Sequence, residues 1–351
     1  MTRRLVQAAV VGTTSWGTTL AIHLAKLGHP VALWARTPEE AEQLRQDGEN
    51  RRFLPGFPFP PSLRVTASLS DAFGEATLVV IVVPSKSIRQ NAQRVREVLR
   101  PDAIIVSATK GLEMSTGGRM TQVLREEMPA PLWGRICALS GPNLSAEVAR
   151  GLPTSTVIAC QDEAVAREVQ AEFMSPQLRV YTNVDVIGVE LAGALKNVIA
   201  LGTGIGDGLG YGNNSKAAFI TRGLAEIARL GVAAGANPLT FAGLAGLGDL
   251  VATAASPLSR NRYVGEQLAK GRGLGEILTG MRNVAEGVDT TAAAMRLSRE
   301  LRVDMPITRA AYGVLFEGLK PQDAVAALME RAPQPEWMGI VASGEGQSWI
   351  R

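Results

Sequence analysis

The sequence predicts an α/β protein in two parts, a doubly wound domain over residues 1–183 and an all-α domain over residues 184–331. In the first part, short runs rich in valine and isoleucine alternate with segments of helical periodicity, which is typical of parallel strands joined by crossover helices. In the second part, helical segments follow one another without a further strand pattern. Residues 332–351, which include two tryptophans, are expected to form a C-terminal extension.

The composition is that of a globular protein large enough for two cores. The chain has 351 residues, 46% of them hydrophobic, and domains usually contain about 100–200 residues. Its net charge of +3 comes from balanced acids and bases, so we expect no nucleic-acid surface. Cys137 and Cys160 lack metal-ligand spacing and are expected to be buried free thiols. We expect a cytoplasmic protein with no transmembrane segment and no metal site.

The N-terminal segment predicts a strand, a glycine turn, a helix and a second strand. These cover Val6–Val11, Gly12–Gly17, Thr18–Leu27 and Val31–Ala35. This is the Rossmann-type βαβ context in which backbone N–H groups at a helix start bind a pyrophosphate. A glycine turn that joins a strand to a helix without any nucleotide is the alternative interpretation.

Two positions in this segment bear on the cofactor. Thr14 stands where the dinucleotide motif usually has its middle glycine, so we expect it to displace the phosphates slightly or to lend them its hydroxyl. The second strand ends in Trp34-Ala35-Arg36, with no acid before Glu39. An acid there would bind the ribose 2′-hydroxyl of NAD, whereas an arginine can hold the 2′-phosphate of NADP. The sequence therefore predicts that NADPH is used at least as well as NADH, although Arg36 could instead be a solvated loop charge.

Further strands are expected to end in polar turns. A proline-rich loop is predicted over Glu49–Pro61. Ligands of open α/β sheets bind outside the carboxyl ends of the strands, which makes Pro84-Ser85, Lys110 and Gly141–Asn143 candidates for one crevice. Turns at strand ends are also common for purely structural reasons. Further strands are predicted at Thr77–Ser85, within Asp102–Glu113, at the start of Arg135–Gly151, at Thr154–Cys160 and at Leu178–Asn183. A helix is predicted between the last two of these, at Glu163–Met174.

The stretch Ile187–Lys216 begins as an apolar helix that carries one lysine. Lys196 lies between the small residues Gly193 and Ala200, which leaves room for a ligand to approach its ammonium. The alternative is a core helix with a snorkelling lysine. Glycines crowd residues 202–212, so the backbone there should bend tightly or pack close to another element. The predicted helices of this half are Val186–Leu201, Asn213–Ala234, Pro238–Gly243, Arg262–Lys270, Leu274–Thr279, Thr290–Glu300, Thr308–Glu317 and Pro321–Met329.

Two polar spots follow in the helical half. Asp249 places a carboxylate in a glycine-flanked apolar segment, and Ser259-Arg260-Asn261 reads as a helix start, where N–H groups and an arginine suit a phosphate. Each could equally be a cap or a surface charge. Because helices follow a doubly wound domain, the active site is expected in the cleft between the two.

Together these stretches resemble the NAD(P)-dependent glycerol-3-phosphate dehydrogenases. The resemblance is carried by GTTSWGTTLA, NRRFLPG, VVIVVPS, ATKGLE, LSGPNLSAEVA, VELAGALKNVIALGTGIGDGLGYGNNSKAA, GLAGLGDLVAT, SRNRYVG and AEGVDT, in family order from about residue 8 to 330. It implies reversible oxidation of sn-glycerol 3-phosphate to dihydroxyacetone phosphate on NAD or NADP. The reverse, biosynthetic direction supplies the phospholipid backbone in bacteria-like members of the family. The expected partners are this small-molecule substrate and, in a homodimer, a second copy of the chain.

The resemblance also implies residue roles. Lys196 is the implied proton acceptor, and a lysine can act so near neutral pH only if its pKa falls well below ~10.4, through burial or a cationic neighbour such as Lys110. Departures from the family pattern are Thr14, Asn143 and Ser145. The implied substrate contacts are Lys110, Gly141, Asn143, Lys196, Asp249, Ser259, Arg260 and Asn261. The implied cofactor contacts, with the two turn glycines, are Gly12, Ser15, Trp16, Gly17, Arg36, Lys110, Ser145, Arg260, Val284 and Glu286.

Two other functions are weighed against this one. A related 3-hydroxy-acid or 6-phosphogluconate-type dehydrogenase would share the two-domain plan and a lysine base, but its substrate carboxylate would require a different anion site. A non-catalytic nucleotide sensor would keep the glycine turn but would need none of Lys110, Lys196, Asp249 and Arg260.

Overall fold

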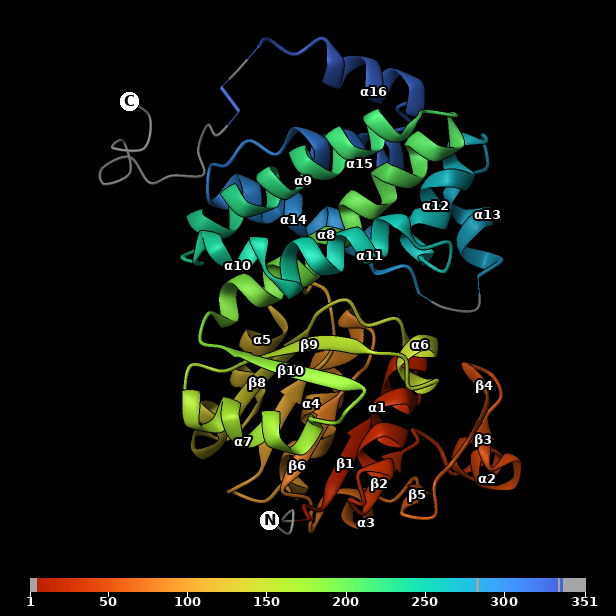
Figure 1. The fold of residues 1–351 in the computed structure, drawn as a ribbon, viewed down its shortest axis with the longest axis vertical. Coiled ribbons are helices and arrows are strands. Elements are labelled where there is room, and N and C mark those ends of the chain that lie inside the picture. Colours follow the sequence, from red (N-terminus) through yellow and green to blue (C-terminus); the bar gives the residue numbers. More distant parts are fainter. Residues whose placement is uncertain (1–4, 282–283, 334, 337–351) are drawn as a thin grey trace. The chain divides into compact units, whose positions relative to one another are not determined.

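The computed structural model describes residues 5–281, 284–333 and 335–336 (Figure 1). The chain divides into two compact units. Unit 1 comprises Met1–Glu113 and Gly118–Glu190, and unit 2 comprises Met114–Gly117 and Leu191–Arg351. The division at Glu190 falls inside helix α8 (Val186–Gly208), whereas the sequence analysis drew the boundary just before this helix. Most of the expected extension 332–351 lies outside the described residues.

Unit 1 is built on an eight-stranded sheet in the order β10-β9-β8-β7-β6-β1-β2-β5 (Figure 1). All neighbouring strands are parallel except β8 and β9, which are antiparallel. The predicted doubly wound sheet is therefore confirmed. The strands are β1 (Ala8–Val11), β2 (Val31–Trp34), β5 (Leu63–Thr66), β6 (Leu78–Ile81), β7 (Ile104–Ser107), β8 (Ile136–Ser140), β9 (Thr154–Ala159) and β10 (Leu178–Asn183).

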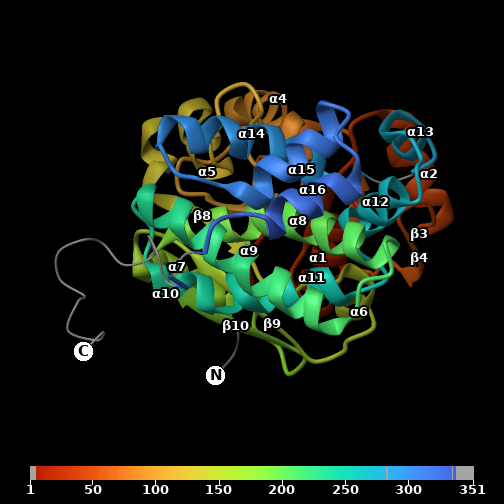
Figure 2. The same ribbon diagram turned by 90° about the horizontal axis from the view of Figure 1, so that it is seen from above.

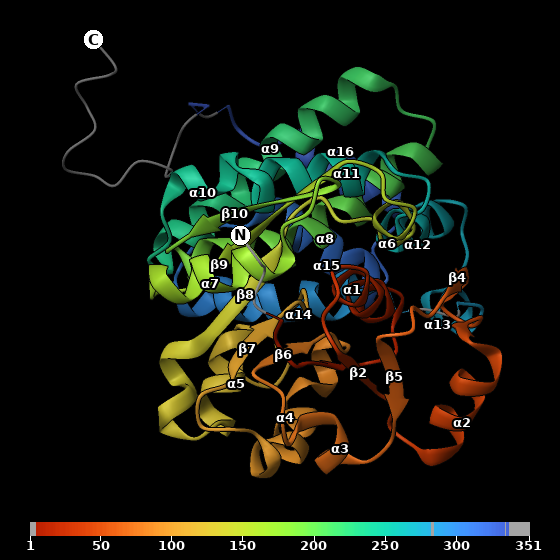
Figure 3. The same cartoon turned by 60° about the horizontal axis from the view of Figure 1, so that its bottom comes forward.

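Both faces of the sheet are buried, because side chains alternate along each strand. In β1, Ala8 and Val10 belong to the apolar cluster under α1 and α7, whereas Ala9 and Val11 belong to the cluster under α3, α4 and α5. Figure 3 shows α1 on one side of the sheet and α3 and α4 on the other. Cys137 and Cys160 are buried free cysteines, as expected. The helices of unit 1 are α1 (Ser15–Lys26), α2 (Pro38–Asp47), α3 (Leu69–Phe73), α4 (Ile88–Val95), α5 (Met120–Glu127), α6 (Ser145–Ala149) and α7 (Glu163–Phe173).

The segment predicted as a proline-rich loop contains a small hairpin instead, with strands β3 (Glu49–Asn50) and β4 (Leu54–Pro58). Asn50 is 1% exposed, and its side-chain amide donates to the Thr13 carbonyl and to the Thr18 hydroxyl, both at 2.8 Å. The hairpin is thereby fastened to the turn between β1 and α1. The prolines hid it in the sequence, because they are depleted in strands.

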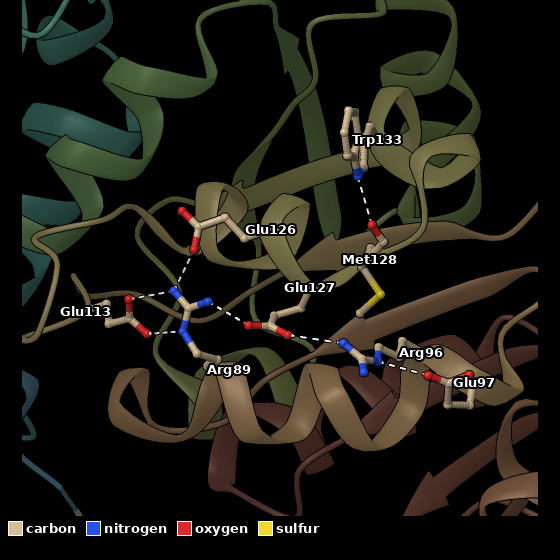
Figure 4. A network of polar contacts seen from close by, with 8 residues as sticks. All are labelled: Arg89, Arg96, Glu97, Glu113, Glu126, Glu127, Met128 and Trp133. Carbon is tan, nitrogen blue, oxygen red and sulfur yellow. Dashed lines mark hydrogen bonds and ion pairs between the residues drawn. The ribbon is translucent and has the colours of Figure 1, made fainter.

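An ion-pair network holds the loop after β7 in place (Figure 4). Arg89 of α4 bonds both carboxylate oxygens of Glu113 at 2.8 Å, and it also bonds Glu126 at 2.7 Å and Glu127 at 2.6 Å. The hydrogen bond from Arg89 lowers the pKa of Glu127. Since Glu113 lies three residues after Lys110, the network holds this loop against α4 and α5.

Unit 2 is helical throughout its described residues, and the predicted helical segments are confirmed. Figure 2 shows α8 running among α9, α11, α12, α14 and α15. One helix was not predicted, α11 (Asp249–Ala255), which follows a π-helical turn over Leu244–Gly248. The remaining helices are α9 (Asn213–Ala233), α10 (Pro238–Ala242), α12 (Arg260–Ala269), α13 (Leu274–Thr279), α14 (Glu286–Glu300), α15 (Pro306–Phe316) and α16 (Pro321–Met329).

The glycines after Leu201 were expected either to let the backbone bend tightly or to let it pack close to another element, and the structure shows close packing. Helix α8 continues to Gly208 without a bend at the first glycine. A Cβ on Gly204 would lie 1.9 Å from the Arg262 carbonyl oxygen, and one on Gly265 of α12 would lie 1.9 Å from that of Leu201. Only glycine lets the two backbones approach so closely. By length and composition alone α8 could cross a membrane, but 83% of its most apolar window is buried, as in the core helix of a soluble protein.

Candidate active site

The turn between β1 and α1 requires its two glycines. Gly12 has a φ of +114°, and a Cβ there would lie 2.3 Å from the Val82 carbonyl oxygen. A Cβ on Gly17 would lie 2.1 Å from the Gly12 carbonyl oxygen. The turn is therefore as tight as a dinucleotide loop must be, and it leads into the N-terminus of α1, where backbone N–H groups suit a pyrophosphate.

The structure bears on one of the two alternatives expected for Thr14, that it lends its hydroxyl to the phosphates. Its φ of −69° is open to any residue, so the backbone conformation of the turn does not itself require glycine at this position. Its hydroxyl caps α1 by accepting from the Gly17 N–H at 3.0 Å and donates to the Val82 carbonyl at 3.1 Å. The hydroxyl is thus used inside the turn instead of being lent to a phosphate.

The expected cofactor contacts Ser15, Trp16 and Ser145 lie near this turn. Ser15 and Trp16 form the first turn of α1, and the Ser15 hydroxyl donates to the Phe53 carbonyl at 2.6 Å. The Thr19 hydroxyl lies 2.8 Å from the Ser15 carbonyl and 3.3 Å from that of Ser145. These contacts bring the start of α6 beside the start of α1.

The tip of β2 carries an acid that the sequence analysis missed. Arg36 is exposed, as a reader of a 2′-phosphate would be. The Glu40 carboxylate, however, folds back to the strand end, where it accepts from the Arg36 backbone N–H at 3.2 Å and from the Thr13 hydroxyl at 2.5 Å. The sequence pattern indicated no acid before Glu39, but in the structure α2 returns the Glu40 carboxylate to this tip.

Lys110, Gly141 and Asn143 meet at the carboxyl ends of β7 and β8. The Lys110 ammonium donates to the Gly141 carbonyl at 2.8 Å. Gly141 has a φ of +147°, and a Cβ there would lie 3.0 Å from the Thr156 Cα. The Asn143 side chain accepts from the Thr156 hydroxyl at 2.9 Å. Topology thus gathers three predicted residues that lie up to 33 positions apart into one polar cluster.

Lys196 is buried in unit 2 beside a carboxylate. Its residue is 6% exposed, and its ammonium donates to Asp249 at 2.7 Å and to the Thr253 hydroxyl at 2.5 Å. The predicted burial is confirmed. Lys110 was expected as a cationic neighbour, whereas the charged group that contacts Lys196 within unit 2, at 2.7 Å, is the anion Asp249. Thr253 was missed because α11 was not predicted, although its spacing of four from Asp249 would place both on one helix face.

A second set of buried contacts joins α8, α12 and α14 and includes Asn197, the residue that follows Lys196. The Asn261 amide donates to the Asn197 side chain at 2.8 Å, and its oxygen accepts from the Gly287 N–H at 2.9 Å. Asn261, one of the implied substrate contacts, is thus held by hydrogen bonds to α8 and α14. Ser259 caps α12 by accepting from the Arg262 N–H at 3.3 Å, so the predicted helix start is confirmed.

Arg260, the first residue of α12, is exposed. Glu286, the first residue of α14, attracts Arg260 electrostatically. Val284 lies in the loop that precedes α14. The predicted residues thus form sets within each unit. Unit 1 holds Gly12, Ser15, Trp16, Gly17, Arg36, Lys110, Gly141, Asn143 and Ser145, and unit 2 holds Lys196, Asp249, Ser259, Arg260, Asn261, Val284 and Glu286.

Comparison with known proteins covers nearly the whole chain. Residues 7–166 match the model of the NAD-dependent glycerol-3-phosphate dehydrogenase N-terminus, and residues 185–326 match that of its C-terminus. A glycerol-3-phosphate dehydrogenase (NAD(P)+) of Chlorobium limicola is 49% identical over 328 residues, which is 93% of this chain and 98% of the relative. One from Citrifermentans bemidjiense is 50% identical over 323 residues, covering 92% and 96%.

A solved structure agrees with this comparison. The crystal structure of glycerol-3-phosphate dehydrogenase from Coxiella burnetii superposes with a TM-score of 0.88 at 36% identity, and it covers 93% of this chain and 99% of that one.

Proposed function

The chain belongs to the NAD-dependent glycerol-3-phosphate dehydrogenase family, and on this premise we propose how its residues carry out the reaction. It is an oxidoreductase that transfers a hydride reversibly between sn-glycerol 3-phosphate and dihydroxyacetone phosphate, with NAD or NADP as cofactor. The observation that carries the mechanism is the buried ammonium of Lys196, held by Asp249 and Thr253.

The cofactor supplies or accepts the hydride when it is bound. We propose that the Gly12–Gly17 turn and the N-terminus of α1 hold its pyrophosphate, because the turn is too tight for any side chain at either glycine. Further contacts are assigned by the family resemblance to Ser15, Trp16, Arg36, Lys110, Ser145, Arg260, Val284 and Glu286.

Lys196 is assigned the proton transfer. In the reductive direction its ammonium donates a hydrogen bond to the carbonyl oxygen at C2 of dihydroxyacetone phosphate, polarises it, and gives up a proton as the hydride arrives. In the oxidative direction the neutral amine takes the proton of the C2 hydroxyl. Asp249 and Thr253 orient the amine through their hydrogen bonds to it.

The substrate phosphate is assigned to the start of α12. Arg260 is exposed there beside the Ser259 cap, and a guanidinium at a helix N-terminus binds phosphate through charge-assisted hydrogen bonds. Binding the phosphate away from C2 lets the energy of that contact orient the reacting carbon. Lys110, Gly141, Asn143 and Asn261 are the remaining proposed substrate contacts.

We also propose a biosynthetic role, in which reduction of dihydroxyacetone phosphate supplies glycerol 3-phosphate for glycerophospholipids. The family resemblance supports this role, together with action in the cytoplasm and as a homodimer.

The test is dihydroxyacetone-phosphate-dependent oxidation of NADH and NADPH by the full chain, run in parallel. Lys196→Met should lower kcat by ~10²–10⁴-fold while nucleotide binding is kept. This variant leaves the Asp249 carboxylate buried without its cation, so Lys196→Met/Asp249→Asn is measured beside it to separate lost chemistry from lost stability.

A folded Lys196→Met enzyme that keeps more than about half of the wild-type turnover would contradict the assignment. Turnover of a 3-hydroxy acid or 6-phosphogluconate, with none of dihydroxyacetone phosphate, would favour the related dehydrogenase instead.

A further inference from the structure

Glu40 lies where the glycine turn and the tip of β2 meet. It is the third residue of α2, and it is partly buried. One carboxylate oxygen accepts from the Thr13 hydroxyl at 2.5 Å, and the other accepts from the Arg36 backbone N–H at 3.2 Å. Thr13 belongs to the turn assigned to the pyrophosphate. Arg36 lies two residues after the end of β2, the strand at whose end dinucleotide folds recognise the adenosine ribose.

Helix capping alone does not account for these contacts. Thr37 caps α2 by accepting from the Glu40 N–H at 3.2 Å. In a capping box the third residue reaches back to the N–H of the cap residue itself. The Glu40 carboxylate reaches past Thr37 to Arg36, and across to Thr13, 27 positions earlier in the chain. Its position is therefore set by the glycine turn as well as by its own helix.

We propose that Glu40 accepts a hydrogen bond from the ribose 2′-hydroxyl and selects NADH over NADPH, an inference that rests on the proposed function. In related folds this acid is the last residue of the second strand. Here β2 ends at Trp34, Arg36 follows two residues later, and the first turn of α2 returns a carboxylate to this end of the strand. A carboxylate accepts a hydrogen bond from the 2′-hydroxyl of NADH and repels the 2′-phosphate of NADPH. One group would therefore both favour NADH and disfavour NADPH.

The carboxylate is held against such a repulsion. Moving it away would cost the hydrogen bonds from both Thr13 and Arg36, and bonds to an ionised acceptor are stronger than neutral ones. Because Glu40 is partly buried, salt screens its charge less than it would screen an exposed one. A 2′-phosphate would thus be attracted by Arg36 and repelled by Glu40, and in this proposal the repulsion by Glu40 is the larger effect.

The adjacent Glu39 offers a matched control. It lies in the same turn of the same helix, is exposed, and its carboxylate contacts Thr37 and its own backbone. The experiment determines Kd by nucleotide titration without substrate, and kcat/KM with dihydroxyacetone phosphate, for NADH and NADPH. Glu40→Gln keeps a hydrogen-bonding side chain and removes the charge. It should raise the ratio of kcat/KM for NADPH to that for NADH by about tenfold or more, and lower the ratio of the corresponding Kd values by about the same factor. Glu39→Gln should leave both ratios within about twofold.

Salt gives an independent measurement. The difference in NADPH affinity between wild type and Glu40→Gln should shrink as ionic strength rises, because salt screens the repulsion that only wild type contains. An unchanged ratio in Glu40→Gln would overturn the inference. So would an equal loss of both nucleotides with a lower Tm, which would show that Glu40 only caps α2 and steadies the turn.

The titrations separate this inference from the function on which it rests. If neither nucleotide supports reduction of dihydroxyacetone phosphate, the proposed function fails, yet the ratio of the two Kd values still shows whether Glu40 discriminates between the nucleotides. If reduction proceeds and that ratio does not respond to Glu40→Gln, the function stands and the inference fails.

Discussion

At the scale of single residues, Lys196 is held by two side chains of α11. The residue is 6% exposed, and its ammonium donates to Asp249 at 2.7 Å and to the Thr253 hydroxyl at 2.5 Å. These contacts fix the direction in which the amine points, so proton transfer in both directions of the proposed reaction depends on Asp249 and Thr253 for its geometry.

A first residue-scale prediction concerns Arg260. Arg260→Ala should raise the KM for dihydroxyacetone phosphate by about 10–150-fold, since hydrogen bonds to charged groups contribute ~1.5–3 kcal/mol. It should also remove most of the preference over unphosphorylated dihydroxyacetone. Steady-state kinetics with both substrates measures this. Arg272→Ala, which loses the ion pair with Glu276 and a hydrogen bond to Gln267, is the control. A preference as strong as that of wild type would place the phosphate elsewhere.

A second residue-scale prediction concerns Glu226, which is fully buried and caps α15. Its carboxylate accepts from the Ile307 and Thr308 N–H groups at 2.7 and 2.8 Å. Burial raises the pKa of Glu226 above its usual 4.5, against the lowering effect of these hydrogen bonds. Above pH 4.5 the native state therefore holds a proton that the unfolded chain has released. The unfolding free energy should fall as pH rises from 4.5 to the raised pKa.

Urea unfolding across this pH range, on wild type and Glu226→Gln, measures the effect. Glutamine keeps an acceptor for one of the two N–H groups, which bond different oxygens of Glu226, and it does not titrate. The Glu226→Gln variant should therefore be less stable overall, but its stability should lack this slope. If the two pH profiles run parallel, Glu226 has the same pKa in the folded and unfolded states.

At the scale of elements, the contact between α8 and α12 depends on glycine in both helices. Gly204→Ala would place a Cβ 1.9 Å from the Arg262 carbonyl oxygen, and we expect it to lower the unfolding free energy by about 1–3 kcal/mol through overpacking. Gly206 lies one half-turn further along α8, and its Cβ would find its nearest neighbour 3.9 Å away. Gly206→Ala should therefore stabilise the protein by up to ~1 kcal/mol, through helix propensity.

Urea unfolding of both variants decides this prediction, and the pair shares one helix and one chemical change. Effects of the same sign and size would show that α8 and α12 can separate at no cost. The same elements position the site, because α8 carries Lys196 and α12 begins at Arg260.

At the scale of the whole molecule, the proposed ligand contacts divide between the two units. Unit 1 contains the glycine turn and the tip of β2, and unit 2 contains Lys196 and the start of α12. Helix α8 belongs to both units, since it begins at Val186 and the division falls after Glu190. Each ligand should therefore leave its own pattern of protection along the chain.

Amide hydrogen exchange tests this prediction. NADH alone should slow exchange in the segment 12–17, whereas glycerol 3-phosphate should slow it at the start of α12, around residues 259–262. Both effects are expected because amides exchange from locally opened states of the protein, and a bound ligand lowers the population of those states by mass action. The helix start of α15 at Pro306, whose cap Glu226 is buried, is an internal control that should not respond. Protection of the α12 start by NADH alone, with none in the glycine turn, would contradict the assignment.

The sequence by itself determined the order and type of most elements, because strand and helix periodicity are local properties. It also indicated Gly12, Gly17 and Lys196, since a tight turn and a lysine among small residues are visible in short stretches. The tertiary structure decided what these groups contact. The bond between Lys196 and Asp249 joins residues 53 positions apart, and that between Thr13 and Glu40 joins residues 27 apart. Periodicity cannot report such pairs, because packing of whole elements brings them together, and this is why the anion beside Lys196 and the acid at the tip of β2 emerged only from the fold.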